Sequence, residues 1–477
     1  MLNTQIATPR TFEGKPIITA PAIIGASPQK PILYKIPVLG KRPIRYSLTP
    51  LPEGLTLDNN TGIISGQIQA ASQYKITITV ENELGKASKE VLFDIKADNI
   101  CQTPLMGWTS WNAYRCNISQ DKVMSVAEAM CGSGLIEYGY QYVNIDSGWQ
   151  GEYGGKYDAI QPKPTFPDMS KMCSDVHCMG LKIGIYSTPM QLSWGDSLLP
   201  GCTQAPLDPH YADTHFGIGK NHKEKNNVDQ WCEWGFDYLK YDWRPTDIQN
   251  AGIMREWLTK CKRDFAFSVT LRANIRDKDF WMKNCSSWRD NEDSYDRWET
   301  LMAIINDSEK WMGYCVPGHF LDLDMLEAGK ILCRENKLTE DEQLTAFSYR
   351  VIFPSPLQIS CDVTRLSDFD LAMFCNEEII AINQDALGAG AYAILDEKSY
   401  NEKNAVVKRI KVMKKPLEDG GYALGCFNFG TTVEKIVLPV EKASVLRDLW
   451  AKKELIRSSD TLELTLEPHT VRMIKVL

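Results

Sequence analysis

One short segment near the middle of the chain, GFDYLKYDWRP at residues 235–245, ends an apolar run in two opposite charges. Its aromatic and leucine side chains predict a buried strand that closes with Lys240 and Asp242. Charged groups at the end of a buried strand cost free energy unless they are paired or used. Because alternate side chains of a strand share one face, we expect Lys240 and Asp242 to point into the same site.

Acids also close or follow four other apolar segments of the chain. They are Asp146, the pair Asp290 and Asp293, the pair Asp322 and Asp324, and Asp362. One such acid is more often a helix N-cap or an ion-pair partner, but five segments that end in acid predict a rim of carboxylates. Five tryptophans lie near these segments in the sequence: Trp108, Trp111, Trp149, Trp243 and Trp288. Aromatic faces that stack on sugars, together with carboxylates that bind hydroxyls and transfer protons, predict a carbohydrate site.

The elements that must position these acids alternate between strand and helix from residue 105 to about 388. Eight strands are predicted at 106–111, 140–146, 181–187, 236–242, 265–271, 286–290, 319–325 and 356–362. Helical segments separate most of them; one begins after Ser119 as N-cap and ends near Gly132. This alternation of strands and helices predicts a (β/α)8 TIM barrel, a fold whose active sites lie at the C-terminal ends of the strands. A doubly wound open sheet is the rival fold, but no G-x-G-x-x-G follows the first strand.

The sequence on either side of the predicted barrel has a different pattern of apolar and polar residues. Residues 1–98 contain short alternating runs, such as 74–82 and 90–97, between turn signals, and they predict an Ig-like β-sandwich module. Residues 389–477 alternate with period two and predict a C-terminal antiparallel β-sandwich. The chain is therefore predicted to be multidomain, with the Ig-like module at 1–98, the catalytic barrel at 99–388 and the second sandwich at 389–477.

Composition excludes several classes of function. The 477 residues carry a formal net charge of -8 without a basic run, which argues against a nucleic-acid partner. No apolar run approaches about 18 residues, so no membrane span is expected, and the chain begins without the pattern of a signal peptide. The 14 cysteines are too dilute for a disulfide scaffold. Cys173 and Cys178 lack the paired spacing of a zinc site, so mostly buried thiols with one or two bridges are expected.

Six longer motifs resemble one family of enzymes. They are TPLMGWTSWNAYRCNISQDKV (103–123), GYQYVNIDSGW (139–149), GLKIGIYS (180–187), WGFDYLKYDW (234–243), WRDNEDSYDRW (288–298) and NEEIIAINQDALG (376–388). In this order they resemble glycoside hydrolase family twenty-seven, the α-galactosidases and α-N-acetylgalactosaminidases. The resemblance runs from about residue 103 to 388, and a C-terminal sandwich also fits that family. It implies a TIM barrel and a retaining, double-displacement mechanism that requires no metal and no cofactor.

The resemblance also assigns roles to individual residues. Asp242 matches the family's nucleophile, and Asp293, four residues after Arg289, matches its general acid/base. Four others match substrate-binding positions: Trp111, Asp146, Lys240 and Arg289. A retaining glycosidase holds its two carboxyl groups about 5–5.5 Å apart. We expect Lys240 to favour the ionised form of Asp242, and the four acids crowded in DNEDSYD (290–296) to raise the pKa of at least one of them.

The chain departs from the family's pattern around the predicted sugar site. Ser147 stands where relatives carry a second acid that helps to hold the O4/O6 side of galactose. A serine there is expected to leave room for a larger group or a water, unless an acid from a neighbouring loop fills the gap. Other departures are Thr188, the pair Trp243 and Arg244, and the triplet Thr270, Leu271 and Arg272, which replaces residues that line the pocket at C2 of the sugar. We include Ser147 and Thr270 in the predicted substrate-binding set.

The predicted activity is exo-hydrolysis of terminal α-D-galactosides, with an oligosaccharide or polysaccharide as the substrate. The altered positions leave α-N-acetylgalactosaminide, β-L-arabinopyranoside and isomaltose-type glucan open as alternatives. A Schiff-base role for Lys240, as in aldolases, needs a lowered pKa that the nearby Asp242 opposes. A non-catalytic carbohydrate-binding protein is disfavoured because both Asp242 and Asp293 are present. Glycan substrates and the Ig-like module favour a periplasmic or secreted location.

Overall fold

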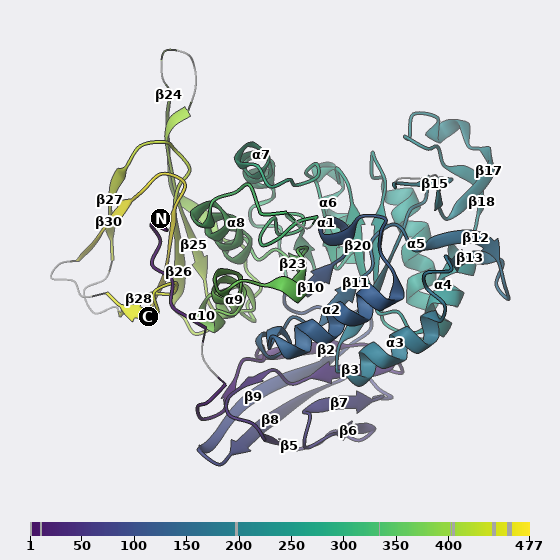
Figure 1. Ribbon diagram of the computed structural model, residues 1–477, viewed down its shortest axis with the longest axis horizontal. Helices are drawn as coiled ribbons and strands as arrows, with labels where there is room; N and C mark the ends of the chain where they lie inside the picture. Colours follow the sequence, from purple (N-terminus) through teal and green to yellow (C-terminus); the bar gives the residue numbers. More distant parts are fainter. Residues whose placement is uncertain are drawn as a thin grey trace.

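The structure is a computed structural model that describes residues 2–9, 12–195, 199–332, 334–400, 402, 406–440, 445–455 and 460–477. Figure 1 shows a central barrel between two regions of strands, one at the bottom formed by the start of the chain and one at the left formed by its end. No helix in the described ranges is long and apolar enough to cross a lipid bilayer. The thirteen cysteines in these ranges are free thiols, and Cys333 lies outside the described residues.

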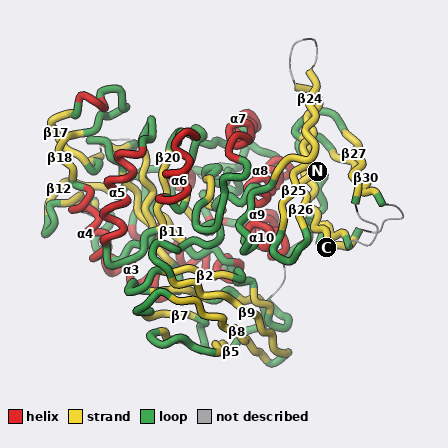
Figure 2. The backbone as a smooth tube through the Cα atoms, turned by 180° about the vertical axis from the view of Figure 1, so that it is seen from behind, coloured by secondary structure: helices red, strands yellow, loops and turns green. Residues whose placement is uncertain are grey.

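The N-terminal region is a β-sandwich, as predicted from its alternating runs. One sheet has the order β2 (Ile23–Ala26), β9 (Gly85–Ile95), β8 (Ser72–Asn82) and β5 (Arg45–Thr49), and the other has the order β3 (Ile32–Lys35), β7 (Ile63–Gly66) and β6 (Leu55–Leu57). A small pair joins β1 (Ile17–Ile18) to β4 (Val38–Leu39). Ile76, Ile78 and Val80 alternate on β8 and are fully buried, so the period of two places one face of this strand in the sandwich core. Figure 2 shows these strands packed below the barrel.

The middle of the chain forms the predicted barrel. Its strands are β10 (Met106–Thr109), β11 (Tyr142–Asn144), β14 (Lys182–Ser187), β19 (Tyr238–Asp242), β20 (Ala266–Thr270), β21 (Ser287–Trp288), β22 (Phe320–Leu321) and β23 (Leu357–Ile359). All eight lie within the predicted ranges, and neighbouring strands pair in parallel in chain order, with β23 beside β10. The segment that follows β22 contacts β23 through Leu326, whose amide donates to the Gln358 carbonyl at 2.8 Å.

Helices, of which the longer ones cover the outside of the sheet, follow most of the barrel strands. They are α1 (Trp111–Tyr114), α2 (Gln120–Gly132), α3 (Met169–Cys178), α4 (Glu224–Trp234), α5 (Ile248–Lys260), α6 (Lys278–Asn284), α7 (Trp298–Ser308), α8 (Glu340–Ile352), α9 (Asp368–Phe374) and α10 (Glu377–Asn383). Ser119 caps α2 by accepting from the Lys122 amide, as its sequence predicts, and Asp247 caps α5 in the same way. Because α7 begins only at Trp298, Asp293 is not a helix cap and is free for another role.

Hairpins that the sequence did not predict extend the loops after the strands. They are β12 (Gln150–Gly154) with β13 (Ala159–Pro162), β15 (Leu192–Ser193) with β16 (Leu199–Pro200), and β17 (Thr203–Leu207) with β18 (Gly219–His222). Figure 1 shows β12, β13, β17 and β18 together at the right of the barrel.

The C-terminal region is antiparallel, as predicted. Its main sheet has the order β24 (Tyr392–Tyr400), β25 (Val406–Pro416), β26 (Tyr422–Asn428), β31 (Val471–Val476), β28 (Leu446–Asp448) and β29 (Lys453–Glu454), and β27 (Glu434–Pro439) pairs with β30 (Thr461–Leu466). Aromatic contacts join it to α8, with Phe347 and Trp450 ring centroids 6.0 Å apart and those of Tyr349 and Phe427 5.6 Å apart.

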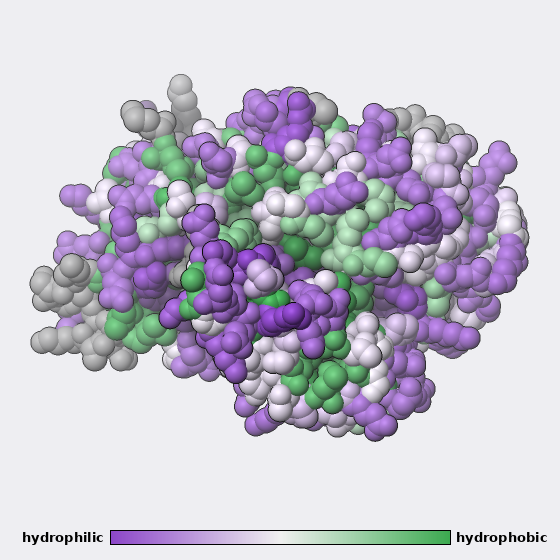
Figure 3. Space-filling model, turned by 60° about the horizontal axis from the view of Figure 1, so that its bottom comes forward, coloured by the Kyte–Doolittle hydropathy of each residue, from purple (hydrophilic) through white to green (hydrophobic). Residues whose placement is uncertain are grey.

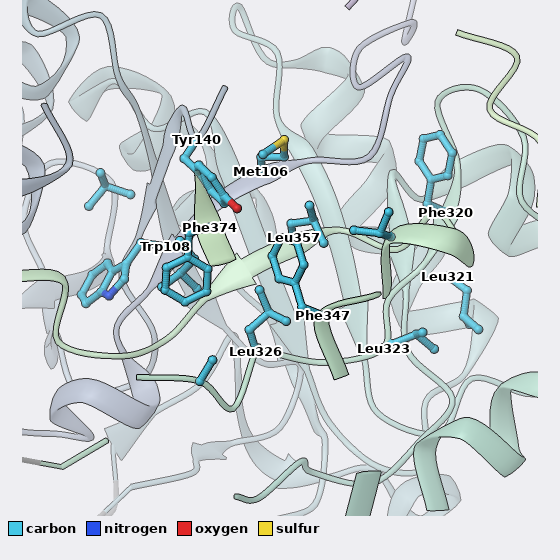
Figure 4. Packing of buried hydrophobic residues seen from close by; sticks show 14 of the residues in the cluster. Met106, Trp108, Tyr140, Phe320, Leu321, Leu323, Leu326, Phe347, Leu357 and Phe374 are labelled. Carbon is cyan, nitrogen blue, oxygen red and sulfur yellow. The ribbon is translucent and has the colours of Figure 1, made fainter. Parts of the chain in front are cut away.

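One continuous hydrophobic cluster runs from the barrel into these contacts. Figure 4 shows Trp108 of β10 beside Phe374 of α9, with Phe347 of α8 and Leu357 of β23 close by. The Trp108 indole donates to the Cys361 carbonyl at 2.8 Å, which satisfies its polar atom inside the core.

Candidate active site

A pocket of about 430 Å³ lies among the loops that follow the barrel strands. It is lined by Trp111, Arg115, Asp146, Ser147, Tyr186, Trp194, Gly195, Lys240, Asp242, Arg244, Leu271, Asp293, Tyr295 and Met325. Six of the eight predicted site residues are among them; the other two, Thr270 and Arg289, lie directly behind the predicted carboxylates. No cluster of three or more metal-ligating side chains occurs in the described part of the chain.

Asp242 is the last residue of β19 and is held at both carboxylate oxygens. The Tyr186 hydroxyl donates to Oδ2 at 3.0 Å, and the Thr270 hydroxyl donates to Oδ1 at 2.8 Å. The sheet explains this arrangement, since Asp242 pairs with Thr270 across β19 and β20, and Tyr186 lies on the neighbouring β14. The two donors fix the orientation of the carboxylate toward the pocket, so Thr270 contacts Asp242 here.

Lys240 lies two residues before Asp242 and pairs with another acid. Its Nζ donates to Asp146 Oδ2 at 2.8 Å, and both side chains are largely buried. Burial acts to lower the pKa of Lys240, but Asp146 and Asp242 outweigh it and raise the pKa above its usual value. The amine therefore stays protonated, which argues against the Schiff-base chemistry considered from the sequence.

Asp293 follows β21 and its side chain is about half exposed (53%). Arg289 donates to Asp293 Oδ1 at 2.7 Å and also forms an ion pair with the buried Asp324. The other Asp324 oxygen accepts from the Ser294 amide at 2.6 Å. Arg289 and Asp324 together fix the loop that carries Asp293, and Arg289 itself is buried beneath the pocket surface.

The pKa directions of the two carboxyl groups differ from the sequence expectation. Burial raises the pKa of Asp242, and the opposing charges of Lys240 and Arg289 do not fully offset it. Burial also acts on Asp293, but Arg289 and Lys240 outweigh it and lower its pKa. The pKa of Asp296 is likewise lowered, because Arg334 and the Lys337 amide outweigh burial. The expectation that crowding raises a pKa in 290–296 is therefore wrong for these two acids, because each faces an arginine.

The predicted rim of acids is narrower than the sequence suggested. Asp290 turns away from the pocket, accepting from the Trp311 indole at 2.5 Å and pairing with Lys310. Asp362 caps the short 3-10 helix that follows it. Asp322 lies beneath the pocket, where burial and the nearby Asp324 raise its pKa to about 6. Asp146, Asp242 and Asp293 are the acids that line the pocket.

The predicted aromatic residues also need correction. Four of the five tryptophans belong to the hydrophobic core and are fully buried: Trp108, Trp149, Trp243 and Trp288. Trp111 lines the pocket as expected, but Trp194, which the sequence analysis did not single out, lines it too. Trp194 follows β15 in a loop, and its ring stacks on His215 at 4.4 Å. Tyr186 was missed for a different reason, since its place in a predicted strand did not reveal its contact with Asp242.

Ser147 lines the pocket, but its hydroxyl is held by the neighbouring loop. The hydroxyl lies 3.0 Å from the Ser193 hydroxyl and donates to the Trp194 carbonyl, and the residue is almost completely buried (1% exposed). The expectation of an acid from a neighbouring loop stays a prediction, because Asp196, two residues after Trp194, lies outside the described residues. Thr188 is buried outside the pocket lining, whereas Leu271 lines it.

Comparisons with known proteins agree with this geometry. Residues 103–205 and 210–385 match the family described as Alpha galactosidase A, residues 408–476 match the alpha galactosidase C-terminal beta sandwich domain, and residues 15–97 match an Ig domain. The chain is 31% identical over 345 residues to Alpha-galactosidase A of Cellvibrio japonicus, which covers 69% of this chain and 76% of that protein. A crystal structure of a Bacteroides fragilis protein, 27% identical, superposes with a TM-score of 0.86 over 98% of both chains. That of alpha-galactosidase I from Mortierella vinacea is 25% identical, with a TM-score of 0.68 over 80% of this chain and 98% of the other.

Proposed function

Since the chain belongs to the alpha galactosidase A family of glycoside hydrolases, we propose that it removes terminal α-D-galactosyl residues with retention of configuration. The observation that carries this proposal is the pair of acids in one pocket with different partners. Asp242 is held by two hydroxyl donors, and Asp293 lies at the partly exposed side beside Arg289. An oriented carboxylate suits a nucleophile, whereas an accessible one suits a group that must exchange protons with the leaving group and with water.

The reaction takes two steps. In the first, Asp242 attacks the anomeric carbon, the glycosidic bond breaks, and Asp293 gives its proton to the departing oxygen. In the second, Asp293 takes a proton from water, whose oxygen displaces the Asp242 carboxylate from the sugar. The ion pair of Asp146 and Lys240 offers both an acceptor and a donor to sugar hydroxyls, and Trp111 offers a face for stacking.

Azide rescue tests the two roles separately. In Asp242→Ala, azide enters the space of the lost carboxylate and should yield β-galactosyl azide from p-nitrophenyl α-galactoside. In Asp293→Ala, azide attacks the glycosyl-enzyme from the opposite face and should yield α-galactosyl azide. Asp121→Ala, on the exposed side of α2, is the matched control and should turn over at the wild-type rate without either azide product. Near-normal hydrolysis by Asp242→Ala would exclude this mechanism.

A second candidate substrate is a β-L-arabinopyranoside. This sugar equals galactose without its C6 group, and Ser147 stands at the position that in relatives helps to hold the O4/O6 side. The Ser147 hydroxyl is bound to the Trp194 carbonyl, so residue 147 itself offers no charged group to O6. Comparing kcat/KM for p-nitrophenyl α-D-galactoside and β-L-arabinopyranoside decides between them; a clear preference for the pentoside would replace galactose as the substrate.

A further inference from the structure

Two arginines stand over the two tryptophans of the pocket. The Arg115 guanidinium lies 4.8 Å from the centre of the Trp111 ring, and that of Arg244 lies 5.1 Å from the centre of the Trp194 ring. Both arginines and both tryptophans line the pocket. The two tryptophans that line the pocket therefore each have a guanidinium against the ring.

Neither arginine has a carboxylate to itself among the described residues. Arg115 has no ion pair or side-chain hydrogen bond with any residue in the described ranges. Arg244 pairs with Glu292 at 3.4 Å, but Glu292 also pairs with Arg272, so two guanidinium groups share one carboxylate. Among the described residues, Arg244 thus has only a shared carboxylate, and Arg115 acts on Asp293 through its charge without an ion pair.

Both arginines are linked to the segment that carries Asp293. Glu292, the partner of Arg244, immediately precedes Asp293. Arg115 is close enough to Asp293 for its charge to lower the pKa of that acid. Because a general acid must contact the oxygen of the leaving group, groups beside Asp293 at the mouth of the pocket contact the rest of that leaving group.

We infer that Arg115 and Arg244 form a leaving-group subsite for a sugar residue that carries an anionic group, either a uronic-acid carboxylate or a sulfate ester. A guanidinium presents parallel N–H donors that match both anions, and Arg115 has its donors free among the described residues. The inference rests on the proposed function, because it takes Asp293 as the acid that contacts the leaving group.

The test compares three α-D-galactosides that differ only in the leaving group: 3-carboxyphenyl, 3-sulfooxyphenyl and the neutral 3-carbamoylphenyl. Wild-type enzyme should favour a charged leaving group by about tenfold in kcat/KM at low ionic strength, and the preference should shrink as salt screens the charges. The ratio between the carboxylate and the sulfate identifies which anion the subsite fits better.

Substitutions assign the preference to these residues. Arg115→Gln and Arg244→Gln should each lose most of the preference for a charged leaving group, and Arg244→Lys should keep part of it. Glu292→Gln should increase the preference, because it releases Arg244 and Arg272. Arg45→Gln, on the N-terminal sandwich, is the matched control and should keep the full preference. Equal kcat/KM for charged and neutral leaving groups in the wild type, or a preference that survives in the double Arg115→Gln, Arg244→Gln variant, would overturn the inference.

Binding separates this inference from the proposed function. If none of the three α-galactosides is hydrolysed, the proposed function fails; calorimetric binding of the same compounds to Asp293→Asn still reports the charge preference. Tighter binding of the charged compounds that is lost in the double variant supports the subsite, and equal binding of charged and neutral compounds overturns it.

Discussion

At the scale of single residues, the pKa values of Asp242 and Asp293 lie in the opposite order to the one that the reaction needs. Burial raises the pKa of Asp242, whereas Arg289 and Lys240 outweigh burial and lower that of Asp293. The proposed first step needs the reverse, with Asp242 ionised and Asp293 protonated. With the pKa of Asp242 above that of Asp293, the reactive combination of proton states is the less populated one in the free enzyme.

This order predicts the shape of the pH profile. Activity should fall on both sides of an optimum, and because the pKa of Asp293 lies below that of Asp242, the acid limb follows Asp293 and the basic limb follows Asp242. Arg115→Gln removes a charge that lowers the pKa of Asp293, so the acid limb of kcat/KM should move to higher pH. The measurement uses neutral p-nitrophenyl α-galactoside at constant ionic strength, with Arg45→Gln as control. A shift of the basic limb alone would contradict the assignment of Asp293.

A second residue-scale prediction concerns Ser147→Asp. The new carboxylate would face the Trp194 carbonyl, which the Ser147 hydroxyl now satisfies, at a residue that is only 1% exposed. A buried acceptor without a donor costs about 1–3 kcal/mol, so we expect a lower Tm and at least about a tenfold loss in kcat/KM. Ser147→Ala is the control that loses only the hydrogen bonds and should be milder. A gain in α-galactosidase activity would show that the Trp194 loop yields and that position 147 contacts the sugar.

The same scale shows why the site was only partly predictable. Motif position could identify Asp242, Asp293, Asp146 and Lys240, because the ends of parallel strands necessarily meet. Trp194 reaches the pocket only through contacts between loops that are distant in sequence, such as its carbonyl with Ser147. The pattern also could not separate Trp108, which packs behind the sheet, from Trp111, which follows the strand by two residues.

At the scale of elements, strands and caps were predictable because their signals are local. Each barrel strand is a short apolar run. Ser119 caps its helix by accepting a hydrogen bond from the amide of Lys122, three residues further along the chain. The hairpins β12–β13 and β17–β18 carried no comparable signal and were missed.

Helix α8 links an outer element to the site. Arg350, fully buried, donates to the carbonyls of Leu323 at 2.8 Å and Asp324 at 3.2 Å. These contacts position the segment that contains Asp324. Asp324 forms an ion pair with Arg289, and Arg289 donates to Asp293. The helix begins with a capping box, in which Thr339 accepts from the Glu342 amide and its own amide donates to the Glu342 side chain.

Two substitutions on this helix should separate stability from activity. Thr339→Ala removes the cap and should lower the free energy of unfolding by about 1 kcal/mol while leaving kcat/KM unchanged at temperatures where the protein is folded. Arg350→Met leaves buried carbonyls unsatisfied and releases Asp324, so both Tm and kcat/KM should fall. Thermal unfolding and steady-state kinetics measured on the same samples check this. Equal kcat/KM in Arg350→Met and Thr339→Ala would show that α8 does not position Asp293.

At the scale of the whole molecule, the N-terminal sandwich is joined to the barrel through a buried acid. Glu137 pairs with Lys35 at 3.1 Å and Arg42 at 2.7 Å and accepts from the Val38 amide at 2.9 Å. Figure 3 turns this sandwich toward the viewer and shows a mostly polar surface with smaller apolar areas. The first residues of the chain extend further, where the amides of Asn3 and Thr4 donate to Asp341 at the start of α8. The start of the chain therefore contacts the barrel at two separate places.

Removal of this sandwich should affect stability more than catalysis. Every residue that lines the pocket lies between Trp111 and Met325, so a chain that begins at Ala97 retains the whole site. It would expose apolar surface, because Leu39 of the sandwich packs into the barrel's cluster. We expect kcat/KM on p-nitrophenyl α-galactoside within about threefold of the full chain, and a lower Tm. A chain that begins at Phe12 is the control for the contacts of Asn3 and Thr4, and Glu137→Gln in the full chain is the control for the buried ion pairs. If the shorter chain unfolds cooperatively and yet lacks activity, the sandwich contributes to the active site. The boundary at residue 98 would then not mark the start of an independent catalytic domain.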